Sequence, residues 1–170
     1  EARSDRKIVY AVNGREELSL HAFMAKGDNN IASPALLLFH GGRWMYGGPE
    51  EFYPQCQYFS AQGFSCFSAQ YRLGANNQPE VLGAVADARA ALDYLIAHAG
   101  ELHIDPDRIV VGGGSAGGQL AAALGSGLPL VRGAAPAAAH RPAAQLLYNP
   151  TLDLAPCTPD HHLVKDFWKD

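Results

Sequence analysis

The sequence predicts an α/β fold, a three-layer sandwich in which a mainly parallel β-sheet lies between two layers of helices. Strand-like and helix-like segments alternate along the chain, and strands that alternate with helices of ten or more residues form parallel sheets covered on both faces. The chain has 170 residues, of which 48% are hydrophobic, which is enough for one globular core and too few for two domains. We therefore expect one domain or part of one.

Four strand patterns occupy the first part of the chain. Residues 7–12 (KIVYAV) and 18–23 (LSLHAF) flank the turn sequence NGRE, which predicts an antiparallel hairpin. The run ALLLF at residues 35–39 is apolar throughout, as expected of a strand that is buried on both faces. FSCFSA at residues 64–69 is the fourth strand pattern.

Three segments predict helices, and glycines mark the ends of two of them. Residues 50–62 fit a helix that ends at Gly63. Residues 81–99 place apolar side chains three and four positions apart, and Gly100 is expected to end this helix. The third helix is expected at residues 116–124, and two further strands are expected at residues 108–112, after the turn sequence DPD, and at 144–148.

One serine among glycines follows the strand pattern at residues 108–112. The stretch GGGSAGG satisfies G-x-S-x-G at Ser115 in the strand, turn and helix context that this motif requires. Glycines are needed because the serine sits in a strained turn, where side chains on its neighbours would collide with the strand and helix. We predict that Ser115 is a nucleophile. A phosphate-binding turn is the alternative, but the stretch lacks the P-loop lysine and fits G-x-G-x-x-G only loosely.

A second glycine loop, HGGRW, follows the buried strand ALLLF. Its glycine pair lets backbone N–H groups approach a substrate carbonyl oxygen, so we predict an oxyanion hole made by the N–H groups of Gly41, Gly42 and Ala116. His40 precedes the serine in the chain, and we expect it to hold the loop by hydrogen bonds rather than to act as the base. Trp44 is expected to pack or to line the pocket.

These motifs occur in an order that resembles a known family. The resemblance rests on HGGRW, on YRL at 71–73, on residues 87–109, on GGSAGGQLA at 113–121 and on LLYNPTLDL at 146–154. Together they resemble the α/β-hydrolase-fold esterases and lipases, the group with hormone-sensitive-lipase-like and acetyl-xylan- or feruloyl-esterase-like enzymes. Two positions depart from the family pattern: Gln70 stands where an Asp often precedes the YR pair, and Arg43 replaces a third glycine.

The resemblance implies a serine carboxylic-ester hydrolase that forms an acyl-enzyme, acts on short-chain or carbohydrate-linked esters and uses no metal or cofactor. The form H-G-G-x-W also resembles kynurenine-formamidase-like hydrolases, so an arylformamidase-like amide hydrolase stays open. A catalytically inactive hydrolase-like module that only binds a ligand is the other alternative. The N–H of Arg43 is a further possible donor to the oxyanion.

The histidine and the acid of the triad are expected outside this sequence. In the family they follow the segment that resembles LLYNPTLDL, and only 16 residues lie beyond Leu154. We therefore expect residues 1–170 to be the N-terminal portion of a single α/β-hydrolase domain, incomplete at its C-terminal side. A C-terminal segment or a second polypeptide would supply the Asp and the His. The alternative is that His161 or His162 acts with a local Asp.

Composition excludes several kinds of partner. The formal net charge is −4 and the Lys and Arg residues are scattered, so nucleic acid is not an expected partner. The longest strongly apolar run, residues 35–39, is far shorter than the roughly 20 residues of a transmembrane helix. The three cysteines show no metal-ligand spacing, so buried or partly buried thiols are expected. The first residue is Glu1, which fits a removed signal peptide, a removed tag or further leading residues, and the compartment stays open.

Overall fold

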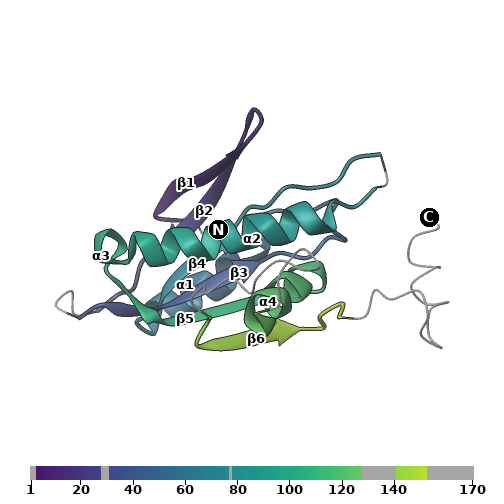
Figure 1. Ribbon diagram of the computed structural model, residues 1–170. Helices are drawn as coiled ribbons and strands as arrows, with labels where there is room; N and C mark the ends of the chain where they lie inside the picture. The colour runs from purple at the N-terminus through teal and green to yellow at the C-terminus, as the bar shows by residue number, and fades with distance from the viewer. Residues whose placement is uncertain (1–2, 28–30, 77, 128–140, 153–170) are drawn as a thin grey trace.

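The computed structural model describes residues 3–27, 31–76, 78–127 and 141–152 (Figure 1). Six strands form one sheet in the order β1-β2-β4-β3-β5-β6. The strands are β1 (Arg6–Asn13), β2 (Glu16–Phe23), β3 (Ser33–Phe39), β4 (Ser65–Ala69), β5 (Ile104–Gly114) and β6 (Ala144–Tyr148). The helices are the 3-10 helix η1 (Pro49–Phe52), α1 (Tyr53–Ala61), α2 (Val81–Ala97), α3 (Ala99–Leu102) and α4 (Ala116–Ser126).

The predicted fold class, an α/β sandwich with a mainly parallel sheet, is confirmed. β3 pairs in parallel with both β4 and β5, and β5 pairs in parallel with β6. The predicted N-terminal hairpin is also present, since β1 and β2 pair antiparallel around the turn at Gly14 and Arg15. β2 then joins the parallel strands through an antiparallel pairing with β4.

Helices cover both faces of the sheet. α2 and α4 lie on one face (Figure 1). Their apolar side chains pack with the larger buried cluster, which includes Leu37, Phe39 and Phe67. α1 lies on the other face, where Phe52 and Cys56 pack with a smaller cluster from β2, β3 and β4. Successive side chains of a strand point to opposite faces, and every residue of the run ALLLF is buried. None of the helices that the structure describes is long and apolar enough to cross a membrane.

Several element boundaries differ from the sequence predictions, and three of these differences change how an element is built. The helix expected at residues 50–62 begins as η1 and becomes α-helical only at Tyr53, where Pro54 fits the first turn because an N–H there has no intrahelical partner. α2 ends at Ala97, two residues earlier than predicted, and Gly100 lies within the separate turn α3. The DPD sequence lies inside β5, which shifts register there: Ser33 aligns with Ile104 and Ala35 with Ile109.

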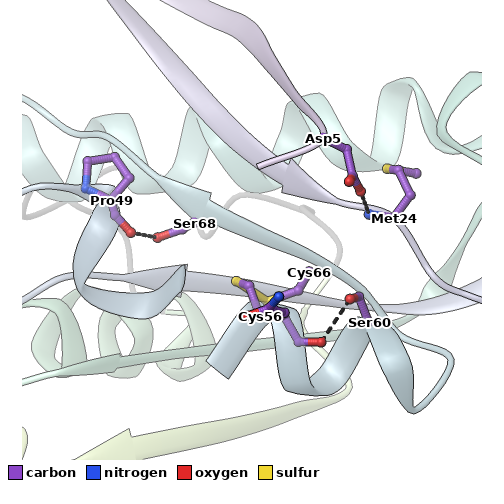
Figure 2. Close-up of a disulfide and its surroundings, with 8 residues drawn as sticks. Asp5, Met24, Pro49, Cys56, Ser60, Cys66 and Ser68 are labelled. Carbon is purple, nitrogen blue, oxygen red and sulfur yellow. Dashed lines mark hydrogen bonds between the residues drawn. A yellow bond between two sulfur atoms is a disulfide. The ribbon is translucent and has the colours of Figure 1, made fainter. Parts of the chain in front are cut away.

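Two of the cysteines correct the expectation of free thiols. Cys56 of α1 and Cys66 of β4 are both fully buried, and they are joined by a disulfide (Figure 2). The pairing has no signature in the sequence, because it depends on α1 packing across the neighbouring strand. The third cysteine, Cys157, lies outside the described residues.

Candidate active site

The carboxyl ends of four neighbouring strands meet at one edge of the sheet. Phe39 of β3 aligns with Ala69 of β4 and with Gly113 of β5, while Gly114 aligns with Tyr148 of β6. The two glycine loops predicted to carry the chemistry leave the sheet at this edge. Open α/β sheets bind their ligands at the carboxyl ends of their strands, so this edge is the candidate site.

Ser115 occupies a sharp turn between β5 and α4. Its backbone has φ 51° and ψ −112°, a conformation with positive φ that is rare for a residue with a side chain. The Ser115 N–H donates to the Tyr148 carbonyl at 2.9 Å, and the Ser115 carbonyl accepts from the Gln119 N–H at 3.1 Å. These bonds hold the strained residue between the last described strand and the first turn of the helix.

Two glycines beside Ser115 are required by packing, as the sequence predicted. A Cβ on Gly117 would lie 2.0 Å from the Phe39 carbonyl oxygen, and one on Gly113 would lie 2.5 Å from the same oxygen. Gly114 differs, because a Cβ there would meet only the Glu51 carboxylate at 3.4 Å and the Phe52 ring at 3.8 Å. The motif glycines therefore bring α4 against the end of β3, whereas Gly114 leaves space beside the serine.

His40 holds the second glycine loop through a hydrogen bond to its backbone. The His40 Nδ1 lies 2.6 Å from the Gly41 carbonyl oxygen, and because a carbonyl only accepts, this nitrogen carries the proton. The Tyr71 hydroxyl donates to the His40 carbonyl at 2.9 Å, and the His40 and Tyr71 rings stack 4.3 Å apart. Burial lowers the pKa of His40, which favours the neutral ring. The predicted structural role of His40 is confirmed.

These contacts set the direction of one predicted oxyanion donor. The Gly41 carbonyl and the Gly42 N–H belong to the same peptide unit, and in a trans peptide the two groups point in opposite directions. Because His40 and Tyr71 approach the Gly41 carbonyl, the Gly42 N–H points away from these rings. The Ala116 N–H is the first of α4, and the first N–H groups of a helix have no intrahelical acceptor.

The loop continues as a left-handed turn. Gly42, Arg43 and Trp44 have φ values of 111°, 59° and 58°, and the Gly42 carbonyl accepts from the Tyr46 N–H at 2.9 Å. Glycine is required at position 42, because a Cβ there would lie 2.1 Å from the Tyr46 carbonyl oxygen. The Trp44 side chain is fully buried in the core, so the packing role expected for it is confirmed.

The third predicted donor, Gly41, already has an acceptor. Its N–H donates to the carboxylate of Glu51, 3.1 Å from Oε2 and 3.2 Å from Oε1. Gly41 does lie beside the predicted nucleophile, since a Cβ on it would be 3.6 Å from the Ser115 Cβ. Its N–H is nevertheless engaged in this structure rather than open to a substrate oxygen. Of the three predicted oxyanion donors, Gly42 and Ala116 remain. Sequence reasoning missed Glu51, because its contact with Gly41 joins two segments that come together only in the folded chain.

The structure brings no base to Ser115 within the residues it describes. In that part of the chain no hydrogen bond joins the Ser115 hydroxyl to a histidine, and no group of three or more His, Cys, Asp or Glu side chains could hold a metal ion. His161 and His162, the alternative candidates for the base, lie outside the described residues.

Comparison with known families gives one match over most of the chain. A family model described as alpha/beta hydrolase fold matches residues 36–170. Curated lipases and carboxylesterases are similar over about half of the chain. Lipase 2 of Moraxella sp. (strain TA144) is 37% identical over 89 residues, which is 52% of this chain and 20% of that protein. Carboxylesterase NlhH of Mycobacterium tuberculosis is 38% identical over 93 residues, which is 54% of this chain and 28% of that protein.

Solved structures of Thermogutta terrifontis esterase 2 are similar over nearly the whole chain. The apo form superposes with a TM-score of 0.83 at 32% identity and covers 98% of this chain and 63% of that chain. The form phosphonylated by cyclosarin gives 0.81 at 33% identity over 92% and 60% of the two chains. The propionate-bound form gives 0.78 at 35% identity over 89% and 57%. The present chain thus spans about 60% of the length of these structures.

Proposed function

Because this chain belongs to the α/β-hydrolase fold family, we propose that it carries the nucleophile and the oxyanion hole of a serine carboxylic-ester hydrolase. The observation that carries the proposal is the strained turn at Ser115, next to a glycine loop whose peptide planes are fixed. Strain of this kind persists only where the surrounding structure enforces it, and it concentrates at functional sites.

The reaction proceeds through an acyl-enzyme. The Ser115 hydroxyl oxygen attacks the ester carbonyl carbon while a histidine takes its proton. The carbonyl oxygen becomes an oxyanion that accepts hydrogen bonds from the Gly42 and Ala116 N–H groups, and the positive end of α4 favours this charge. Collapse of the intermediate expels the alcohol, which receives the proton from the histidine. Water then attacks the acyl carbon while the histidine takes its proton. The bond from that carbon to the Ser115 oxygen breaks, the Ser115 oxygen receives the proton from the histidine, and the carboxylic acid is released.

The Asp and the His of the triad come from residues outside the described part of the chain. A C-terminal segment or a second polypeptide supplies them in this proposal, because a serine hydroxyl alone is a weak nucleophile. The 170-residue chain by itself is then expected to hydrolyse p-nitrophenyl acetate poorly, and the complementary segment to restore turnover. Ordinary enzyme rates from the isolated chain that disappear in His161→Ala or His162→Ala would place the base in this chain instead.

Short-chain esters are the proposed substrates. The support comes from relatives that are named carboxylesterase and lipase, and from structures of Thermogutta terrifontis esterase 2 solved with propionate and with butyrate. The same esterase was also solved phosphonylated by cyclosarin. Reaction of a relative with an organophosphorus compound makes a fluorophosphonate probe the natural test of an activated nucleophile here.

The test replaces the proposed nucleophile in the complete enzyme. Ser115→Ala should abolish fluorophosphonate labelling and lower kcat for p-nitrophenyl butyrate by several orders of magnitude, because it removes one oxygen from a turn that fits a small residue. Ser126→Ala, at the other end of the same helix, is the matched control and should label normally. Labelling of the Ser115→Ala variant would move the nucleophile elsewhere.

The same assay separates the two alternatives. Turnover of N-formylkynurenine in preference to p-nitrophenyl esters would favour an amide hydrolase. Failure of the wild-type protein to react with the probe, together with binding of a ligand, would favour an inactive hydrolase-like module.

A further inference from the structure

A carboxylate lies beside the proposed nucleophile, and the reaction does not use it. Glu51 accepts from the Gly41 N–H through both of its oxygens, at 3.1 and 3.2 Å. Its Oε1 also lies 3.4 Å from the point where a Cβ on Gly114 would stand. Gly41 and Gly114 flank Ser115 in space, since a Cβ on Gly41 would be 3.6 Å from the Ser115 Cβ and 3.4 Å from the Gly114 carbonyl oxygen. Glu51 therefore occupies the space beside the nucleophile that these two glycines leave open.

The segment that carries Glu51 is fixed on both sides. Before it, the Pro49 carbonyl accepts a hydrogen bond from the buried hydroxyl of Ser68 at 2.7 Å, and after it the Cys56–Cys66 disulfide ties α1 to the same strand, β4 (Figure 2). Glu51 itself is exposed to solvent. The position of Glu51 therefore depends on the anchored backbone that carries it and not on burial of its side chain.

Glu51 completes the fixation of one peptide unit in the oxyanion loop. The unit that joins His40 to Gly41 is held at its carbonyl by the Tyr71 hydroxyl and at its N–H by Glu51. The next unit carries the Gly42 N–H, so its orientation depends on this one. Loss of the Glu51 contact would leave this unit held only at its carbonyl, by the Tyr71 hydroxyl.

We propose, on the basis of the ester hydrolase function above, that Glu51 positions the oxyanion loop through the Gly41 N–H and makes the site discriminate against anionic substrates. The substrate class that the site accepts is then uncharged or cationic esters. Glu51 is a positioning residue, since it acts on the reacting atoms through the loop and through its charge.

The two parts of the proposal separate in two variants of the complete enzyme. Glu51→Gln keeps an oxygen that accepts from the Gly41 N–H and removes the charge, whereas Glu51→Ala removes both. Glu101→Gln, on the exposed turn α3, is the control for loss of one surface carboxylate. The substrates are p-nitrophenyl butyrate, which is neutral, and mono-p-nitrophenyl succinate, which carries a carboxylate.

The positioning part predicts a difference between the two variants on the neutral ester. Glu51→Ala should lower kcat by about ten- to a hundredfold with little change in KM, because a displaced donor acts mainly on the transition state. Glu51→Gln should rescue most of this loss. Equal kcat values for wild type, Glu51→Gln and Glu51→Ala would overturn the positioning role, and so would equal losses in both variants.

The charge part predicts a change in selectivity. Because Glu51 is exposed and solvent screens its charge, its repulsion of a substrate carboxylate is expected to change the rate by about two- to fivefold. The ratio of kcat/KM for the anionic ester to that for the neutral ester should therefore rise by about this factor in both variants. High salt should reduce the difference from wild type. An unchanged ratio would overturn the discrimination, and Glu101→Gln should leave the ratio as in wild type.

If the wild-type protein hydrolyses no ester, the proposed function is refuted. The contact between Glu51 and the Gly41 N–H can then still be tested by a measurement that does not depend on catalysis. Hydrogen exchange of the Gly41 amide, followed by NMR in protein labelled with 15N-glycine, should be faster in Glu51→Ala than in wild type and in Glu51→Gln. Equal exchange in the three proteins would show that Glu51 does not hold this amide.

Discussion

Replacement of Gly117 by alanine tests the packing that places Ser115, the proposed nucleophile. A Cβ at this position would lie 2.0 Å from the Phe39 carbonyl oxygen and 2.4 Å from that of His40, whereas ordinary contact begins at 3.4 Å. α4 would have to move away from β3 by about 1.4 Å, and both oxygens belong to backbone that cannot rotate aside. Overpacking of this kind costs about 2 kcal/mol, which corresponds to a fall in Tm of about 4–8 °C for a chain of this size.

The displacement also separates Ser115 from the oxyanion loop. Because a misplacement of about 1 Å can lower a rate about a hundredfold, kcat for p-nitrophenyl butyrate in the complete enzyme should fall by about that factor. Thermal unfolding and steady-state kinetics measure the two effects. Gly100→Ala is the control, since a Cβ there meets nothing within 4 Å and alanine favours a helical turn. If Gly117→Ala unfolds and turns over like wild type, the packing argument for the glycines of this turn fails.

Two further predictions concern stability. Cys56→Ser should lower the free energy of unfolding by about 2–3 kcal/mol, because the disulfide closes a short loop of the unfolded chain; chemical denaturation with and without a reductant measures this, and equal stabilities would contradict it. Burial lowers the pKa of His40 in the folded protein, so the unfolded chain binds a proton at this histidine more readily than the folded protein does. The free energy of unfolding should therefore fall as the pH is lowered below about 6.5, the ordinary pKa of histidine. His40→Asn, which keeps a donor for the Gly41 carbonyl, should flatten the dependence of Tm on pH between about 7 and 5; an unchanged slope would rule out this source.

Much of the fold follows from local patterns in the sequence. The buried run ALLLF and the strand at residues 144–148 lie where they were predicted, because apolar content and alternation with helices constrain both. The boundaries that differ depend on contacts between elements. Within the DPD sequence the Asp107 N–H donates to the Asp105 carboxylate, but these residues are part of β5, and pairing with β3 continues on both sides of them.

In the candidate site, too, the features that depend on a local motif could be predicted from the sequence, and those that depend on packing could not. Ser115 and the loop of His40 were visible because each motif is short and lies next to its own strand. The Cys56–Cys66 pair and the Glu51 contact were not visible, because each joins two elements whose distance depends on the packing of α1. The family resemblance drawn from the motifs is confirmed by the match over residues 36–170.

Arg43, which replaces the third glycine of the family pattern, lies in a backbone conformation that favours glycine. Arg43 has φ 59°, a left-handed conformation that costs a residue with a side chain roughly 1–2 kcal/mol and glycine almost nothing. The neighbouring turn residue Trp44 has φ 58°, and its ring is fully buried in the core. The loop is thus held in a strained shape by the buried ring on one side and by the contacts of His40 and Glu51 on the other. Because each of these contacts acts on a different peptide unit, the direction of the Gly42 N–H depends on all of them together.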